Sequence, residues 1–170
     1  MYKLKPITYA MGILEKGTFY MNVSHILNKK ADASYSVTAD QSLSEAVAMM
    51  AEHRIGSVVV LESGSLKSIM TERDVLMALG RGRDLSQVKV GEVMAPSLIT
   101  CTADTSLDEA MDLMIHNDTG RRIRHLPVVE GDECVGMLSI GDVVEALLTK
   151  KEFENKLLKN YIQNWPDDEK

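Results

Sequence analysis

The sequence TADQSLSEA at residues 38–46 recurs as TADTSLDEA at residues 102–110, with seven of the nine positions identical. The offset between these copies is 64 residues, whereas TERD at 71–74 aligns with SIGD at 139–142 at an offset of 68. Self-similarity at a long period indicates a repeated structural unit. The second copy therefore contains four extra residues, which we expect in the polar loop around 117–120.

Both copies predict the element order β-α-β-β-α. Ser42 and Ser106 are each followed three residues later by a glutamate, the pattern of a capping box that begins a helix. Apolar residues at helical spacing come next, and then two β-rich runs joined by a glycine-containing turn. Asp74 and Asp142 are predicted as N-caps of the closing helices. The predicted strands are 35–38, 57–61 and 66–70 in the first copy, and 98–102, 125–129 and 134–139 in the second.

These units give the predicted organisation of the chain. The ranges are an N-terminal extension at 1–20, a first repeat at 21–80, a linker at 81–89, a second repeat at 90–149, and a C-terminal helix with an acidic tail at 150–170. The tail extends the last helix with an apolar stripe that ends at Pro166. This stripe either packs back on its own domain or contacts a second copy of the chain. Its residues are Phe153, Leu157, Leu158, Tyr161, Ile162 and Trp165.

The composition is that of a folded domain, with 170 residues of which 45% are hydrophobic and 26% charged. No apolar run approaches the roughly 20 residues that cross a bilayer, and residues 1–20 lack the apolar core of a secretion signal. A net charge of −6 disfavours nucleic acid as a partner. Cys101 and Cys134 lack CxxC spacing, which favours buried thiols in a reducing compartment and predicts a cytoplasmic location.

The segments that close each copy carry a further pattern. GMLSIGD at 136–142 fits Gly-hydrophobic-hydrophobic-Thr/Ser-x-x-Asp, and SIMTERD at 68–74 departs from it only at Ser68. With RHLPV at 124–128, these motifs resemble tandem cystathionine-beta-synthase (CBS) domains over residues 21–149. The resemblance is to a stand-alone CBS-domain protein related to the regulatory module of IMP dehydrogenase. It implies an α+β fold in which two repeats pack through their sheets as a pseudo-twofold pair.

The same resemblance implies two clefts between the repeats, each able to hold an adenosine-containing ligand such as AMP, ADP, ATP or NAD(H). An aspartate at a helix start offers two acceptor oxygens to the two ribose hydroxyls, and a hydroxyl with free helix amides suits a phosphate. In one cleft the implied residues are Asp142 and Ser139 for ribose and phosphate, Arg124 and His125 for phosphates, and Tyr35, Ile55, Gly56 and Ser57 around the adenine. In the other cleft they are Asp74 and Thr71, with Gly56 and Ser57 on the phosphate side and Ile99, Ile123 and Arg124 around the base. Because Gly56 and Ser57 carry no positive charge, this cleft is expected to bind multiply charged phosphates poorly unless Arg54 or Arg73 compensates.

The function that these features predict is a non-catalytic regulatory module that signals through a change of conformation or assembly. A constitutive dimerisation or scaffold module without a physiological ligand is the alternative, and S-adenosylmethionine or nucleic acid is a further candidate ligand. No motif for nucleophilic catalysis, paired carboxylates or a phosphate loop is present, so no enzyme activity and no catalytic cofactor are expected. The four histidines lack metal-site spacing. A homodimer and an unidentified regulated protein are the expected partners, with no membrane.

Overall fold

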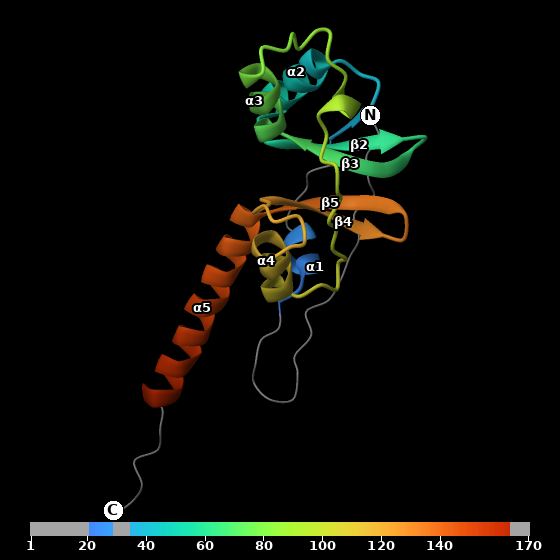
Figure 1. Cartoon of the computed structure of the whole chain (residues 1–170). Coiled ribbons are helices and arrows are strands. Elements are labelled where there is room, and N and C mark those ends of the chain that lie inside the picture. The colour runs from blue at the N-terminus through green and yellow to red at the C-terminus, as the bar shows by residue number, and fades with distance from the viewer. Residues whose placement is uncertain (1–20, 29–34, 164–170) are drawn as a thin grey trace, which may run out of the picture.

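The computed structural model describes residues 21–28 and 35–163, except for the side chains of residues 157 and 160–163 (Figure 1). Two groups of helices and strands follow one another along the chain, and their sheets face each other through β3 and β5. This arrangement confirms the predicted α+β fold with two packed repeats. The elements are α1 (Val23–Leu27), β1 (Ser36–Thr38), α2 (Leu43–His53), β2 (Ser57–Glu62), β3 (Ser65–Thr71), α3 (Glu72–Gly80), the 3-10 helix η1 (Val90–Glu92), α4 (Leu107–Ile115), β4 (His125–Glu130), β5 (Glu133–Ser139) and α5 (Ile140–Gln163).

The two sheets differ by one strand. In the first repeat, β1 pairs in parallel with β2, which pairs antiparallel with β3. In the second repeat, β4 and β5 form a hairpin, and the strand predicted at 98–102 is reduced to an isolated bridge between Cys101 and Val128. A proline explains the difference. The amide of Val59 donates to the Tyr35 carbonyl at 2.9 Å, but the equivalent residue in the second repeat, Pro127, has no N–H to donate.

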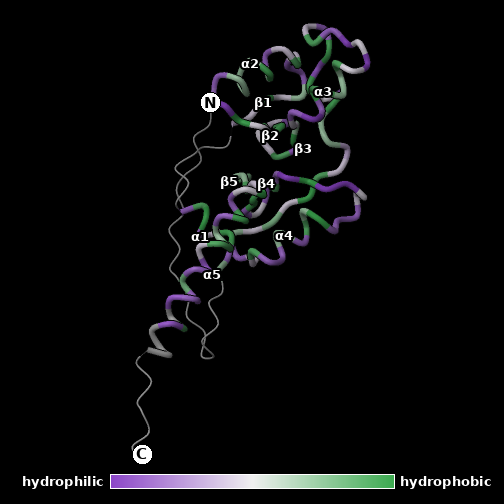
Figure 2. The backbone as a smooth tube through the Cα atoms, turned by 90° about the vertical axis from the view of Figure 1, so that its left-hand side faces the viewer, coloured by the Kyte–Doolittle hydropathy of each residue, from purple (hydrophilic) through white to green (hydrophobic). Residues whose placement is uncertain are grey.

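Each repeat has its own core, and each core contains a segment that precedes the other repeat in the sequence. Met21 and α1 pack with α4, β4, β5 and α5 of the second repeat (Figure 2). Residues 88–94 pack with the first core, where Val88 and Val90 are buried. The segment that precedes each repeat in the sequence therefore packs in the core of the other repeat. We call this arrangement the crosswise exchange of the leading segments. The predicted linker at 81–89 ends inside the first core.

Backbone hydrogen bonds show that the two exchanged segments are equivalent. The amide of Leu107 donates to the Met21 carbonyl at 3.0 Å, and the amide of Leu43 donates to the Val88 carbonyl at 2.8 Å. Each segment thus fixes the first turn of the helix in the opposite repeat. The linkage holds the two repeats together independently of the contact between their sheets.

The departure from the closing motif at Ser68 follows from this exchange. Gly136, at the equivalent position, lies against α1, and a Cβ atom added there would be only 2.6 Å from Cδ2 of Leu27. Ser68 is buried, and its hydroxyl donates to the Ala95 carbonyl at 2.7 Å. The glycine makes room for a leucine side chain, whereas the serine binds the backbone of the segment that crosses the first repeat.

The last helix continues the second repeat into the tail, as predicted, and projects away from both sheets (Figure 1). Val143 near its start is fully buried, whereas Phe153 and Leu158 of the predicted stripe are 48% and 58% exposed. Packing of the tail back on its own domain therefore does not describe these two side chains. The side chains of Leu157, Tyr161 and Ile162, and the residues Trp165 and Pro166, lie outside the described part of the chain.

Two methionines lie in the cores, and the predicted burial of both cysteines is confirmed. Met50 and Met114 are buried in the two cores. Cys101 and Cys134 are both buried. Burial, with smaller contributions from Cys134 and Glu109, raises the pKa of Cys101 to about 12.

Candidate ligand-binding clefts

The start of the closing helix has the same geometry in both repeats. Oδ2 of Asp74 accepts the backbone amide and the hydroxyl of Thr71 at 2.8 and 2.7 Å. Oδ2 of Asp142 accepts the backbone amide and the hydroxyl of Ser139 at 2.7 and 2.6 Å. Each Ser/Thr-x-x-Asp motif thus forms a capping box where the last strand of its repeat ends.

These contacts correct the predicted position of the caps. Thr71 is the N-cap of α3, and Asp74 is the third residue of that helix. Ser139 likewise precedes α5, so Asp142 lies inside the first turn. The prediction that both aspartates are N-caps is wrong, because Thr71 and Ser139 already occupy the N-cap positions. A carboxylate in the first turn is favourable beside the positive end of the helix dipole.

The capping box of the first repeat uses only one carboxylate oxygen of Asp74. Its Oδ1 atom accepts no hydrogen bond from any residue among those described, and the side chain is half-buried. A carboxylate held in place through one oxygen offers the other to a ligand hydroxyl. The equivalent Asp142 is also half-buried and lines a pocket.

The predicted site residues at the start of β2 and β4 lie beside these helices. The amide of Glu72 donates to the Gly56 carbonyl at 3.0 Å, and the amide of Ile140 donates to the Arg124 carbonyl at 2.9 Å. The residue before each hairpin is therefore hydrogen-bonded to the first residue of the helix that follows the hairpin. Ser57 follows Gly56 and is buried.

Residues of the two repeats meet at Gly56. A Cβ atom added to this glycine would lie 3.3 Å from Oε1 of Glu72 and 3.4 Å from Cε1 of His125. One helix residue further on, Nη1 of Arg73 donates to the Arg122 carbonyl at 3.4 Å. The structure thus brings together Gly56 and His125, as predicted for a cleft between repeats, and adds Glu72, which sequence reasoning missed.

The side chain of Arg124 is exposed and forms no ion pair with any described residue. Arg124 directly precedes β4, and its carbonyl oxygen accepts the amide of Ile140 at the start of α5. A guanidinium without an internal partner is available to a phosphate.

The predicted base-contacting residues divide between the two cores. Tyr35 and Ile55 pack against the first core, and Ile99 and Ile123 pack against the second. The Tyr35 ring also stacks on His53, with ring centroids 4.1 Å apart. Tyr35 and Ile55 are predicted to border the adenine in the Asp142 cleft. Ile99 and Ile123 are predicted to border the base in the Asp74 cleft, and both roles stay predictions.

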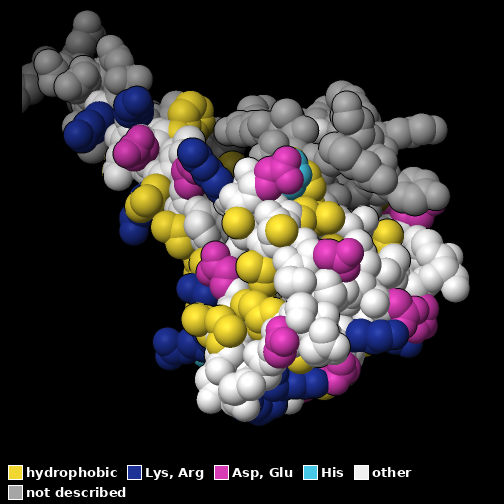
Figure 3. Space-filling view, turned by 90° about the horizontal axis from the view of Figure 1, so that it is seen from above, with side chains coloured by type: hydrophobic (Ala, Val, Ile, Leu, Met, Phe, Trp, Pro, Cys, Tyr) yellow, Lys and Arg dark blue, Asp and Glu magenta, His cyan; other side chains and the backbone are white. Residues whose placement is uncertain are grey.

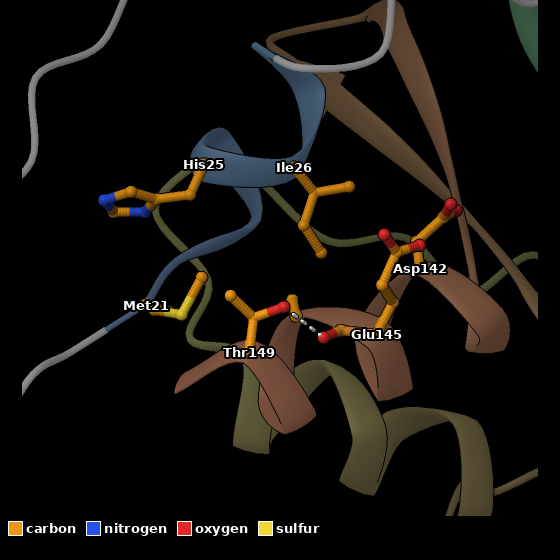
Figure 4. Close-up of a pocket in the computed structure, with 7 residues that line it drawn as sticks. Met21, His25, Ile26, Asp142, Glu145 and Thr149 are labelled. Carbon is orange, nitrogen blue, oxygen red and sulfur yellow. Dashed lines mark hydrogen bonds between the residues drawn. The ribbon is translucent and has the colours of Figure 1, made fainter. Parts of the chain in front are cut away.

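A pocket of about 220 Å³ lies between α1 and α5, next to Asp142 (Figure 4). Apolar and polar side chains share its wall, and the Thr149 hydroxyl donates to the Glu145 carbonyl there at 2.9 Å. The volume is below the roughly 300 Å³ of a small drug-sized site, so it suits part of a ligand. Its residues are Met21, His25, Ile26, Asp142, Glu145, Ala146 and Thr149. Sequence reasoning missed all but Asp142, because α1 was assigned to the other repeat.

The described part of the chain contains no group of three metal-ligating side chains and no helix long and apolar enough to span a membrane.

Comparison with known families gives a match to the CBS domain at residues 23–81 and again at 90–149. The chain belongs to the CBS-domain family. A CBS domain-containing protein of Arabidopsis thaliana, CBSX3, mitochondrial, is 38% identical over 155 residues, which cover 87% of this chain and 73% of the relative. An inosine-5'-monophosphate dehydrogenase of Staphylococcus haemolyticus is 32% identical over 141 residues, which are 81% of this chain but 27% of the enzyme. The match thus includes only a minor part of that enzyme.

Solved structures agree with this assignment. The CBS-domain containing protein ATU1752 from Agrobacterium tumefaciens is 36% identical, with a TM-score of 0.65 and coverage of 74% of this chain and 97% of that chain. The CBS domain pair of protein MJ0100, solved with 5-methylthioadenosine and S-adenosyl-L-methionine, is 22% identical, with a TM-score of 0.65 and coverage of 77% and 98%. The second likeness shows the fold of the CBS pair.

Proposed function

We propose that this CBS pair is a non-catalytic regulatory module that binds an adenosine-containing ligand, such as AMP, ADP, ATP or NAD(H), in the clefts beside α3 and α5. The observation that carries the proposal is the repeated capping box, which fixes a carboxylate oxygen of Asp74 and of Asp142. Both aspartates are half-buried, and Asp142 lines a pocket. A carboxylate can accept both hydroxyls of a ribose. The MJ0100 pair binds adenosine derivatives, which supports this ligand class for the present chain.

A ligand would act by changing the relative placement of the two repeats. The repeats touch through β3 and β5 and through the Arg73 contact to Arg122. A ligand between them that binds one arrangement more tightly shifts the population toward that arrangement. A separate partner protein would bind one arrangement in preference to the other. We also propose that the protein is cytoplasmic.

The alternative function is a constitutive dimerisation or scaffold module, and one surface feature favours it. Leu76 on α3 and Val144 on α5 occupy equivalent positions, and they are 67% and 43% exposed. Met77, Leu79 and Leu148 are also exposed, and hydrophobic side chains reach the surface in a group when the molecule is viewed from above (Figure 3). Such a surface fits a second copy of the chain. Light scattering at tens of micromolar should therefore give a homodimer. A monomer would contradict dimerisation through this apolar surface.

Thermal unfolding in the presence of nucleotides tests the regulatory function against the scaffold. A ligand at about 100 times its dissociation constant adds roughly 2.7 kcal/mol to the free energy of unfolding. We expect a higher melting temperature with at least one of AMP, ADP, ATP, NAD and NADH, with the ligand recovered unchanged. No shift with any of them would contradict the proposal, and stoichiometric hydrolysis would contradict the non-catalytic role.

A further inference from the structure

The carboxylate of Glu72 lies where the two repeats meet. Its Oε1 atom and Cε1 of His125 both approach the Cβ position of Gly56, at 3.3 and 3.4 Å. Glu72 belongs to the first repeat and His125 to the second, so side chains of both repeats border this point. Glu72 is exposed and forms no ion pair with any of the described residues.

The pseudo-twofold relation has no second carboxylate at this place. Glu72 and Ile140 are equivalent, since each donates its amide to the strand start of its own repeat. Ile140 packs against the second core, so its side chain brings no charge to the interface. The interface between repeats is therefore electrostatically unequal, with an added negative charge on the side of Gly56.

We propose that Glu72 is a specificity-determining residue that opposes the binding of phosphate groups beside Gly56, on the phosphate side of the Asp74 cleft. This inference rests on the proposed function and adds to it which ligands are preferred. Like charges at neighbouring positions repel, and each further negative charge on the ligand increases the repulsion. Gly56 and Ser57 supply no positive charge to offset it, and the neighbouring Arg73 is directed to the Arg122 carbonyl. The cleft beside Asp74 therefore favours adenosine ligands with little or no negative charge.

Calorimetric titration of wild type and Glu72→Gln with adenosine, AMP and ATP tests this role. The substitution keeps the size of the side chain and removes its charge. The contribution of an exposed charge pair corresponds to about a two- to fivefold change in affinity. We expect AMP to bind about two- to fivefold more tightly to Glu72→Gln, ATP to gain more than AMP, and adenosine to bind equally to both proteins.

Glu154→Gln is the matched control, because Glu154 is an exposed glutamate on the projecting half of α5 and its substitution changes the net charge equally. Equal gains in Glu72→Gln and Glu154→Gln would overturn the inference, since the effect would then come from net charge alone. Unchanged affinity for AMP and ATP in Glu72→Gln would also overturn it, while the proposed function would stand. No binding of any of the three ligands to either protein would contradict the proposed function itself, and the inference with it.

Discussion

The hydroxyl of Ser139 donates a hydrogen bond to Oδ2 of Asp142 at 2.6 Å, and the amide of Asp142 donates back to that hydroxyl at 3.2 Å. Thr71 and Asp74 form the same hydroxyl-to-carboxylate contact at 2.7 Å. A hydrogen bond to an ionised acceptor is stronger than one between neutral groups. Each aspartate is therefore held in one orientation before any ligand arrives.

Replacement of Asp142 by alanine should weaken adenosine and AMP to a similar extent, because the ribose is common to both. The loss of the capping box should also lower the free energy of unfolding by about 1 kcal/mol. Calorimetry measures the first effect and denaturant unfolding the second. A loss confined to AMP would show that Asp142 does not contact the ribose.

Replacement of Arg124 by alanine should weaken phosphate-bearing ligands and spare adenosine. A charge-assisted hydrogen bond contributes on the order of 1.5 to 3 kcal/mol, which corresponds to a loss of roughly ten- to a hundredfold for AMP. Arg81 is also exposed, lies at the end of α3, and provides the control substitution. Equal losses for AMP and adenosine in Arg124→Ala would show that Arg124 does not bind phosphate.

Gly136→Ala should destabilise the protein, because the new Cβ atom would approach Cδ2 of Leu27 to 2.6 Å. Cδ2 is the far end of the half-buried Leu27 side chain, which can move, so we expect a cost of about 1 kcal/mol, at the low end for overpacking. Gly80→Ala is the control, since a Cβ atom added to Gly80 meets nothing within 4 Å. Urea unfolding of both variants tests whether α1 really packs on the second repeat, and equal stability of the two would contradict that packing.

Cys101 should resist thiol reagents in the folded protein. Its pKa of about 12 keeps the thiol protonated far above neutral pH, and the thiolate is the reactive form. Alkylation with iodoacetamide at pH 8, followed by mass spectrometry, should show Cys101 modified only after unfolding. Rapid modification of the native protein would contradict the burial of this side chain.

The repeat and its element order were predictable because they depend on local signals. The serine and glutamate of α2 form the expected capping box, with the Glu45 amide 3.3 Å from Oγ of Ser42. The hairpins likewise follow from β-rich runs separated by glycine turns. The shortened strand at Cys101 was also within reach, because Pro127 removes one donor of a parallel ladder.

The crosswise exchange of the leading segments was not predictable in the same way. Val23 is fully buried in the second core, yet its neighbours in sequence only indicate an apolar segment. Nothing local distinguishes packing on the nearer repeat from packing on the farther one. For the same reason the pocket beside α5 and the carboxylate of Glu72 were missed, since both depend on contacts between distant parts of the chain.

The proposed function requires that an adenosine ligand binds in the clefts beside Asp74 and Asp142. Calorimetric titration of AMP into wild type and into the double variant Asp74→Asn/Asp142→Asn is the most direct test of this binding. Asparagine keeps the shape of each side chain and removes the charged acceptor that a ribose would use. Circular dichroism first establishes that both proteins are folded. We predict saturable AMP binding to wild type and at least a tenfold loss in the double variant, whereas equal affinity of the two folded proteins would contradict the account.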